Sequence, residues 1–162
     1  MAISPVNLKA TLIQLIEDEI AHAKAGRPAQ IWAKLNSLVD ETIIDSLYKA
    51  SQSGVSIQLV IRGICCLRPG VAGLSDNIEV RSMVGRFLEH ARIFHFKNGG
   101  DEEVYLSSAD WMPPEPGGRL ATSVPALTNP SASDQFAAAK DVLPSFRYAI
   151  AMTQTPVGLA PG

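Results

Sequence analysis

The sequence is poor in cysteine and has no long apolar run. Its only two cysteines, Cys65 and Cys66, are adjacent, which excludes a disulfide framework and a cysteine-rich zinc site. No run of about eighteen apolar residues is present, so we expect no membrane-spanning helix. Residues 1–5 lack the basic start and apolar core of a signal peptide. We therefore expect a cytoplasmic protein.

Neither sign of charge predominates. Lys and Arg number 14 and Asp and Glu number 16, which gives a formal net charge of -2. The overall field therefore does not attract nucleic acid, which we do not expect as a partner, and any anion site must be local. The 162 residues, 46% of them hydrophobic, suit one domain with a packed core and exclude a wholly disordered, collagen-like or coiled-coil chain.

Several common catalytic motifs are absent. The chain has no Gly-x-x-x-x-Gly-Lys-Ser/Thr nucleotide-binding loop, no His-Glu-x-x-His metal helix and no Gly-x-Ser-x-Gly nucleophile elbow. Gly70 and Gly73 lie in a Pro-containing loop rather than at a strand-to-helix turn. They favour a phosphate cradle only weakly.

Residue patterns before Trp111 predict alternating helices and strands, and thus an α/β fold. A strand, a helix capped by Asp40 and a second strand form a βαβ unit with parallel strands. Asn98-Gly99 favours the positive φ of a hairpin turn between two later strands, so the sheet is mixed. The predicted helices are residues 7–25 and 41–53, and the predicted strands are residues 30–36, 55–62, 92–96 and 104–108.

The chain changes character after Met112. Eight of the eleven prolines lie in residues 113–162, together with many Ala, Ser and Thr residues and no periodic pattern. We therefore expect an ordered chain before Met112 and an irregular Pro-rich tail at residues 113–162.

Arginines gather between Arg62 and Arg92 without a single lysine. The planar guanidinium group matches two oxygens of a phosphate or carboxylate, which favours a phosphate-rich ligand. Arg62 ends a parallel strand, and ligands of open α/β sheets bind outside the carboxyl ends of the strands. A functional role is favoured for Arg62 and Arg92. Arg68 and Arg81 are equally well explained as surface charges that pair with Asp76, Glu79 or Glu89.

Histidine and serine residues near this cluster are further candidates. His90 shortly precedes the strand that starts at Arg92, although a lone histidine is more often structural. His95 alternates with phenylalanines and is interpreted as a sheet-face residue, and His22 lies on a helix with no partner motif. Ser107 and Ser108 close a strand, where their hydroxyls either bind a phosphate or start a turn.

Five longer motifs resemble the C-terminal domain of the bacterial long-chain polyphosphate kinases. Their order is kept from about Ser4 to Met112 without an evident gap, which implies one such domain at residues 4–112 followed by a divergent tail at residues 113–162. The motifs are Lys34-Leu35-Asn36-Ser37-Leu38-Val39-Asp40, Ile61-Arg62-Gly63-Ile64-Cys65-Cys66-Leu67-Arg68-Pro69-Gly70, Gly73-Leu74-Ser75-Asp76-Asn77-Ile78, Val84-Gly85-Arg86-Phe87-Leu88-Glu89-His90 and Val104-Tyr105-Leu106-Ser107-Ser108-Ala109-Asp110-Trp111-Met112.

The resemblance implies a phospholipase D-like fold, a mixed sheet flanked by helices. In the family two such domains form one active site between them, and this chain resembles the second. His90-Ala91-Arg92 with Ser107-Ser108-Ala109-Asp110 is similar to the His-x-Lys and Gly-Ser-x-Asn elements of the phospholipase D motif. Arg92 departs from the motif by replacing its lysine, and Lys97 stands where its aspartate would fall.

The family's activity is the reversible transfer of the terminal phosphate of ATP to polyphosphate through a phosphohistidine. By resemblance, His90 is the second active-site histidine and a catalytic residue, whereas the nucleophilic histidine belongs to the preceding domain. Arg62 and His90 are expected to contact the ATP phosphates, with Arg92, Ser107 and Ser108 as further phosphate-binding residues. The resemblance also implies ATP and Mg²⁺, although no carboxylate cluster stands out as a metal site.

The implied partners are ATP or ADP, polyphosphate and the upstream domains, in an enzyme that is a homo-oligomer at full length. A peripheral place at the inner face of the membrane is the alternative to a purely cytoplasmic one. We expect the chain to be inactive alone. Residues 114–118 depart from the family, and one hypothesis is a disturbed reading frame there.

Two other functions stay open. One is a phospholipase D-like phosphodiesterase that completes its active site by dimerisation. The other is a non-catalytic polyanion-binding module built on the arginines between Arg62 and Arg92, whose salt-dependent binding would survive replacement of His90.

Overall fold

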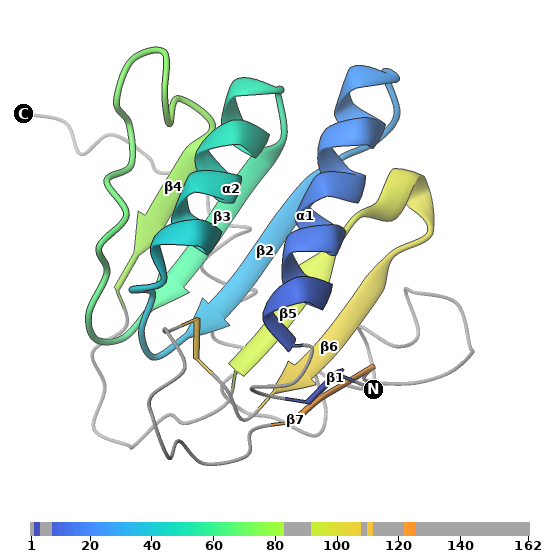
Figure 1. Cartoon of the computed structure of the whole chain (residues 1–162). Coiled ribbons are helices and arrows are strands. Elements are labelled where there is room, and N and C mark those ends of the chain that lie inside the picture. The colour runs from blue at the N-terminus through green and yellow to red at the C-terminus, as the bar shows by residue number, and fades with distance from the viewer. Residues whose placement is uncertain (1, 4–7, 83–91, 108–109, 112–121, 126–162) are drawn as a thin grey trace, which may run out of the picture.

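The computed structural model describes residues 2–3, 8–82, 92–107, 110–111 and 122–125. These residues form a mixed sheet in the order β1-β7-β6-β5-β2-β3-β4, with both α-helices on one face (Figure 1). The helices are α1 (Leu8–Lys24), α2 (Glu41–Gln52) and the 3₁₀ helix η1 (Asn98–Gly100). The strands are β1 (Ala2–Ile3), β2 (Gln30–Leu35), β3 (Ser56–Ile61), β4 (Ile78–Arg81), β5 (Arg92–Phe96), β6 (Glu103–Ser107) and β7 (Thr122–Pro125).

The central unit is β2, α2 and β3. The two strands pair in parallel from Gln30 opposite Ser56 to Leu35 opposite Ile61, which confirms the predicted parallel pair. Alternate residues of each strand point toward the helices and are almost fully buried there with α1 and α2. Burial of this apolar surface is the main stabilising contribution to the unit.

Asp40 caps α2, as its position before an apolar helical pattern predicts. Its side chain accepts the backbone N–H of Ile43 at 3.2 Å and also binds the Nζ of Lys9 at 2.8 Å. The carboxylate is almost fully buried, whereas Lys9 is partly exposed. Asp40 therefore satisfies a helix N-terminus and joins the first turn of α1 to the start of α2.

The predicted hairpin is also present. β5 pairs antiparallel with β6, and it pairs antiparallel with β2 on its other side. Asn98 and Gly99 have φ values of 45° and 66°, so the positive φ predicted for this dipeptide is confirmed. The connection is a short 3₁₀ turn rather than a two-residue loop, and β6 starts at Glu103, one residue earlier than predicted.

Three strands, β1, β4 and β7, were not predicted. β4 pairs in parallel with β3, and the intervening residues 62–77 form no helix. Ser75 holds this connection, because its hydroxyl donates to the carbonyl of Arg68 at 2.8 Å and accepts the N–H of Val71 at 2.9 Å. β7 lies inside the segment predicted as an irregular tail and pairs antiparallel with β6 and β1. Residues 126–162 lie outside the described part.

A buried polar group joins α1 to the hairpin turn. Glu19 is 1% exposed, and its carboxylate accepts the N–H of Gln30 at 2.9 Å and the N–H of Asn98. His22 Nε2 lies 3.0 Å from the side-chain oxygen of Asn98, so this histidine has a structural partner far along the chain. Burial raises the pKa of Glu19, although the two N–H bonds favour its charged form.

In the described part of the chain, neither α1 nor α2 combines the length and the apolar surface that crossing a bilayer requires.

Gly99 tests this contact between α1 and the turn. A Cβ at Gly99 would lie 2.9 Å from His22 Nδ1, whereas one at Gly26, with nearly the same φ (+68° against +66°), would meet nothing within 4 Å. Both Gly99→Ala and Gly26→Ala incur the cost of a positive φ, about 1–2 kcal/mol. We expect Gly99→Ala to lower the free energy of unfolding in urea by about 1–3 kcal/mol more.

The substitution His22→Ala is the internal control. In the His22→Ala background the two glycine substitutions should cost nearly the same. Equal costs in the unsubstituted chain would show that His22 does not pack closely against this turn.

Candidate functional site

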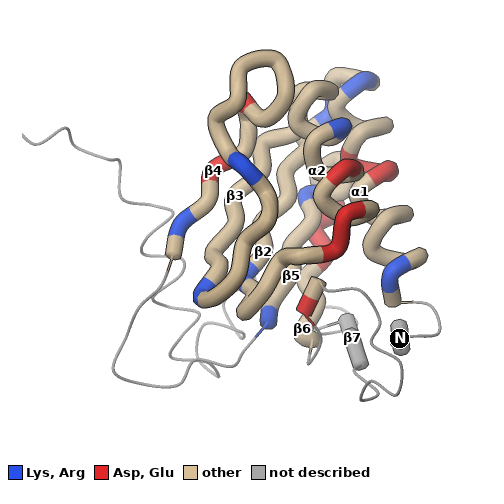
Figure 2. The backbone as a smooth tube through the Cα atoms, turned by 60° about the vertical axis from the view of Figure 1, so that its left-hand side comes forward, with Lys and Arg blue, Asp and Glu red and all other residues tan. Residues whose placement is uncertain are grey.

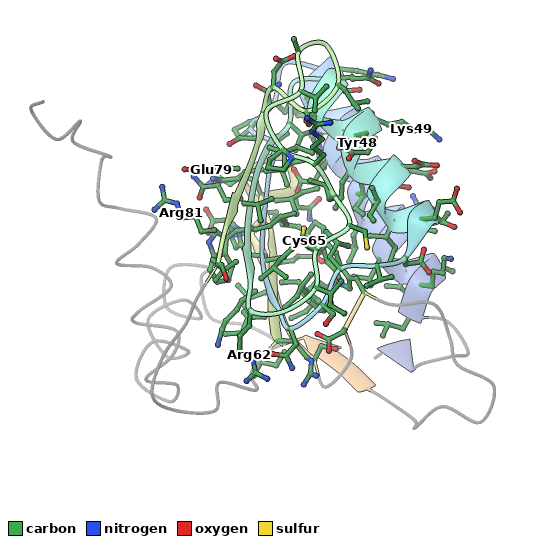
Figure 3. All side chains as sticks on the ribbon, turned by 90° about the vertical axis from the view of Figure 1, so that its left-hand side faces the viewer. Tyr48, Lys49, Arg62, Cys65, Glu79 and Arg81 are labelled. Atoms are coloured by element: carbon green, nitrogen blue, oxygen red, sulfur yellow. The ribbon has the colours of Figure 1, made fainter. Side chains whose placement is uncertain are left out.

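Four strand ends meet at one border of the sheet, where β2, β3 and β6 end and β5 begins, and this border is called the edge below. β2 and β3 finish there side by side, because Leu35 pairs with Ile61. β5 runs in the opposite direction and starts there, and Arg92 pairs with Ser107 at the end of β6. Figure 3 shows Arg62 at this lower end, away from Tyr48 and Lys49 on α2. Pairing alone therefore brings Arg62, Arg92 and Ser107 to one edge.

The edge is cationic. In Figure 2 blue segments, which mark Lys and Arg, gather at the lower ends of β2, β3 and β5. Lys34 and Arg92 lie on neighbouring strands, and Lys34 is 2% exposed. Positive charges at close quarters favour the approach of anions, although the charge of Arg92 is offset by the carboxylate of Asp110.

Gly63 lets the ends of β2 and β3 approach each other closely. The N–H of Arg62 donates to the carbonyl of Leu35 at 3.2 Å, and the N–H of Gly63 donates to the carbonyl of Asn36 at 2.8 Å. A Cβ at Gly63 would lie 3.0 Å from that carbonyl oxygen. A larger residue would require the Asn36 carbonyl to give way, so glycine permits the close approach of the two strand ends beside Arg62.

The carboxylate of Asp110 accepts four hydrogen bonds at the edge. Its Oδ1 accepts the N–H groups of Asn36 at 2.8 Å and Ser37 at 3.2 Å, and also Arg92 Nε at 3.0 Å. Its Oδ2 accepts Arg92 Nη2 at 2.8 Å. The arginine and the aspartate side chains are 12% and 13% exposed. This is the bidentate geometry that arginine favours with a carboxylate.

These donors lower the pKa of Asp110. Burial alone would raise it, but the bonds from Arg92 and from the two backbone N–H groups favour the ionised form and prevail. Asp110 is therefore a carboxylate in the folded chain at neutral pH.

Trp111, next to Asp110, also binds the connection between β2 and α2. Its carbonyl accepts the N–H of Val39 at 2.9 Å and that of Asp40 at 3.0 Å. The indole is 1% exposed and packs on Phe94, with ring centroids 5.1 Å apart. Residues 110–111 thus hold the connection between β2 and α2 on one side.

The opposite side of that connection is held by the residues after Arg62. The N–H of Leu38 donates to the carbonyl of Ile64, and the N–H of Cys66 donates to the carbonyl of Leu38, both at 2.9 Å. Both neighbouring segments thus bind the same short connection between β2 and α2.

The predicted site residues fall into two groups. Arg62, Arg92 and Ser107 are brought together, whereas His90 and Ser108 lie outside the described residues. Arg92 binds Asp110 through two nitrogens, an interaction that the sequence did not reveal. Its role in phosphate binding stays a prediction.

Two of the simpler interpretations hold elsewhere on the sheet. Arg81 pairs with Glu79 at 2.8 Å, as the surface-charge interpretation expects. His95 is a buried sheet-face residue whose Nε2 lies 3.3 Å from Glu102, and burial lowers its pKa. Both lie away from the contacts of Asp110.

Asp110, Trp111 and Gly63 were not predicted as residues that build the site. Two sequence signals could have indicated Asp110: it follows a predicted strand by two positions, and it stands at the last position of the segment that resembles the Gly-Ser-x-Asn element. Its partners Asn36 and Ser37 are more than seventy residues away, so no local pattern shows the contact.

The described residues do not form a metal site built from protein ligands alone. Within the described ranges, no group of three or more His, Cys, Asp or Glu side chains could hold one. The carboxylate nearest the strand ends, Asp110, already accepts four N–H bonds. Mg²⁺ stays an expectation from the resemblance, and no step is assigned to it here.

Comparison with known proteins decides the family. A family model described as polyphosphate kinase C-terminal domain 2 matches residues 1–141. The chain belongs to this family of polyphosphate kinase domains. The polyphosphate kinase of Pseudomonas aeruginosa is 62% identical over 109 residues, which cover 67% of this chain and 16% of that protein. That of Rhodopirellula baltica is 50% identical over 127 residues, or 78% of this chain and 15% of that protein.

A solved structure supports the fold as well. The crystal structure of polyphosphate kinase from Porphyromonas gingivalis matches with a TM-score of 0.73 and 44% identity, over 78% of this chain and 19% of that one. The predicted α/β, phospholipase D-like fold is thereby confirmed. The chain spans about a sixth of the length of the curated polyphosphate kinases that it matches.

The Asp110 contacts predict how stability depends on pH. The folded-state pKa of Asp110 lies below its unfolded value, so its stabilisation is complete above the unfolded pKa and is lost as the pH falls through the folded one. At pH 7 we expect Asp110→Asn to lower the free energy of unfolding by about 1–3 kcal/mol. The free energy of unfolding of the unsubstituted chain and of Asp110→Asn, plotted against pH, should converge in acid. Urea unfolding monitored by tryptophan fluorescence measures both. A constant difference at all pH values would contradict this.

Proposed function

We propose that this chain supplies the ATP-phosphate contacts and the second active-site histidine of a polyphosphate kinase. The enzyme would transfer the terminal phosphate of ATP reversibly to polyphosphate. The observation that carries the proposal is that a chain 62% identical to a polyphosphate kinase places Arg62, Arg92 and Ser107 at one cationic edge. Transfer of phosphate between anions requires concentrated positive charge of this kind.

Arg62 is suited to stabilise charge in the transition state. Its backbone is fixed by Leu35 and by the close approach of Gly63, so the guanidinium group starts from a defined point. Preorganised positive charge lowers the barrier, because it need not be reoriented as negative charge spreads over the transferring oxygens.

His90 is proposed to assist the leaving group. It precedes Arg92 by two residues in the sequence, and Arg92 starts β5 at this edge. A histidine can donate a hydrogen bond or a proton to the β-phosphate oxygen of ADP as it departs.

The transfer itself is proposed to take two displacements. A histidine nitrogen of the upstream domain attacks the γ-phosphorus, the bond to the bridging oxygen breaks, and ADP leaves with the electron pair. A terminal oxygen of polyphosphate then attacks the phosphohistidine and releases the nitrogen. ATP, polyphosphate, the upstream domains and an oligomer of the complete enzyme belong to this proposal.

Reconstitution tests the function. The chain, alone and mixed with the upstream region of the Pseudomonas aeruginosa relative, is incubated with ATP labelled at its terminal phosphate and with a polyphosphate primer. We expect labelled polymer only from the mixture, and no polymer when the chain carries His90→Ala. Synthesis that survives His90→Ala would contradict the role of this histidine. Cleavage of bis(p-nitrophenyl) phosphate without ATP would favour a phosphodiesterase instead.

The role of Arg62 has a matched control within the chain. Arg27 is exposed and lies just before β2, at the opposite edge of the sheet. Arg62→Ala and Arg27→Ala change the net charge equally. We expect Arg62→Ala to weaken ATP binding at least about tenfold and Arg27→Ala to leave it unchanged, as measured by titration calorimetry. Equal losses would show that only the overall charge attracts the nucleotide.

A further inference from the structure

We propose that Asp110 is the positioning residue of this phosphate-binding edge. It would hold the Arg92 guanidinium and the backbone at Asn36 in the arrangement that an anion requires. The inference rests on the proposed function, because it assumes that phosphate groups bind where Arg62 and Arg92 meet. It assigns a role to an acidic residue in a site that binds anions.

An aspartate in such a place needs a physical reason. A carboxylate repels a phosphate, and the repulsion is stronger where water is partly excluded. The side chain of Asp110 is 13% exposed, and four N–H bonds from three residues converge on its two oxygens. Its charge is thus engaged by the protein, and what it contributes is the arrangement of its donors.

The first group that Asp110 arranges is the Arg92 side chain. Bonds from Nε and Nη2 to the two different carboxylate oxygens define the plane of the guanidinium group. A single bond would leave that plane able to rotate, whereas two parallel bonds do not. The planar group therefore keeps one orientation at the start of β5.

The second group is the backbone next to Arg62. Asp110 accepts the N–H of Asn36, and the carbonyl of Asn36 accepts the N–H of Gly63 at 2.8 Å. Asn36 therefore links Asp110 to Gly63, the residue that follows Arg62. A Cβ at Gly63 would lie only 3.0 Å from the Asn36 carbonyl oxygen, so Asn36 is in close contact with the residue that follows Arg62.

The sign of a change in affinity tests the proposal. Asp110→Asn removes a negative charge from a site that binds anions, and this alone would tighten binding. If Asp110 positions the edge, affinity falls instead. We expect Asp110→Asn and Arg92→Lys each to weaken binding of ATP, and of inorganic tripolyphosphate, about tenfold in titration calorimetry at fixed salt.

Asp76→Asn is the matched control. Asp76 is exposed, lies in the connection of residues 62–77, and accepts the N–H of Gly73 at 2.7 Å. The substitution Asp76→Asn removes the same charge at a position away from the edge. The affinity for ATP and tripolyphosphate should therefore stay the same or rise slightly. Unchanged or tighter binding by a folded Asp110→Asn chain would overturn the proposal.

A measurement without ligand separates this inference from the proposed function. In nuclear magnetic resonance of the chain, the backbone amides of Asn36 and Ser37 should be protected from hydrogen exchange. Protection should be lost in Asp110→Ala and kept in Asp76→Asn. Absence of ATP and tripolyphosphate binding in the unsubstituted chain would refute phosphate binding by this chain, whereas amides that stay protected in Asp110→Ala would refute positioning by Asp110.

Discussion

The structure at the carboxyl ends of the central strands depends on one carboxylate with four hydrogen-bond donors. Strands that end together leave N–H groups without a sheet partner, and Asp110 accepts two of these from Asn36 and Ser37. It also neutralises Arg92, whose positive charge lies beside other cations. One oxygen, Oδ1, serves both needs, because it accepts the two backbone N–H groups and also Arg92 Nε.

Much of the fold could be predicted, because its signals are local. The N-cap at Asp40, the apolar alternation of β3 and the positive φ at Asn98 and Gly99 each depend on a few neighbouring residues. β4 was missed because it is only four residues long and follows a connection without a helix. Its place is set by pairing with β3, and such register is not visible in the strand's own sequence.

The candidate site was predicted in part for the same reason. The abundance of arginine pointed to anion binding, and the strand positions of Arg62, Arg92 and Ser107 were sufficient to bring them together. Composition could not show that Arg92 also binds an internal carboxylate, since Asp110 lies 18 residues further along the chain. Nor could it show why Gly63 is needed, which depends on an approach to Asn36.

β4 has a consequence for the behaviour of the chain in solution. Among the described strands it has a neighbour on one side only, and a strand in that position is where another chain can add to a sheet. Its four residues include Glu79 and Arg81, an exposed pair held at 2.8 Å (Figure 3). Because β4 is short and carries charged side chains, it is a poor template for pairing with a strand of another copy. Aggregation through this strand is thereby disfavoured.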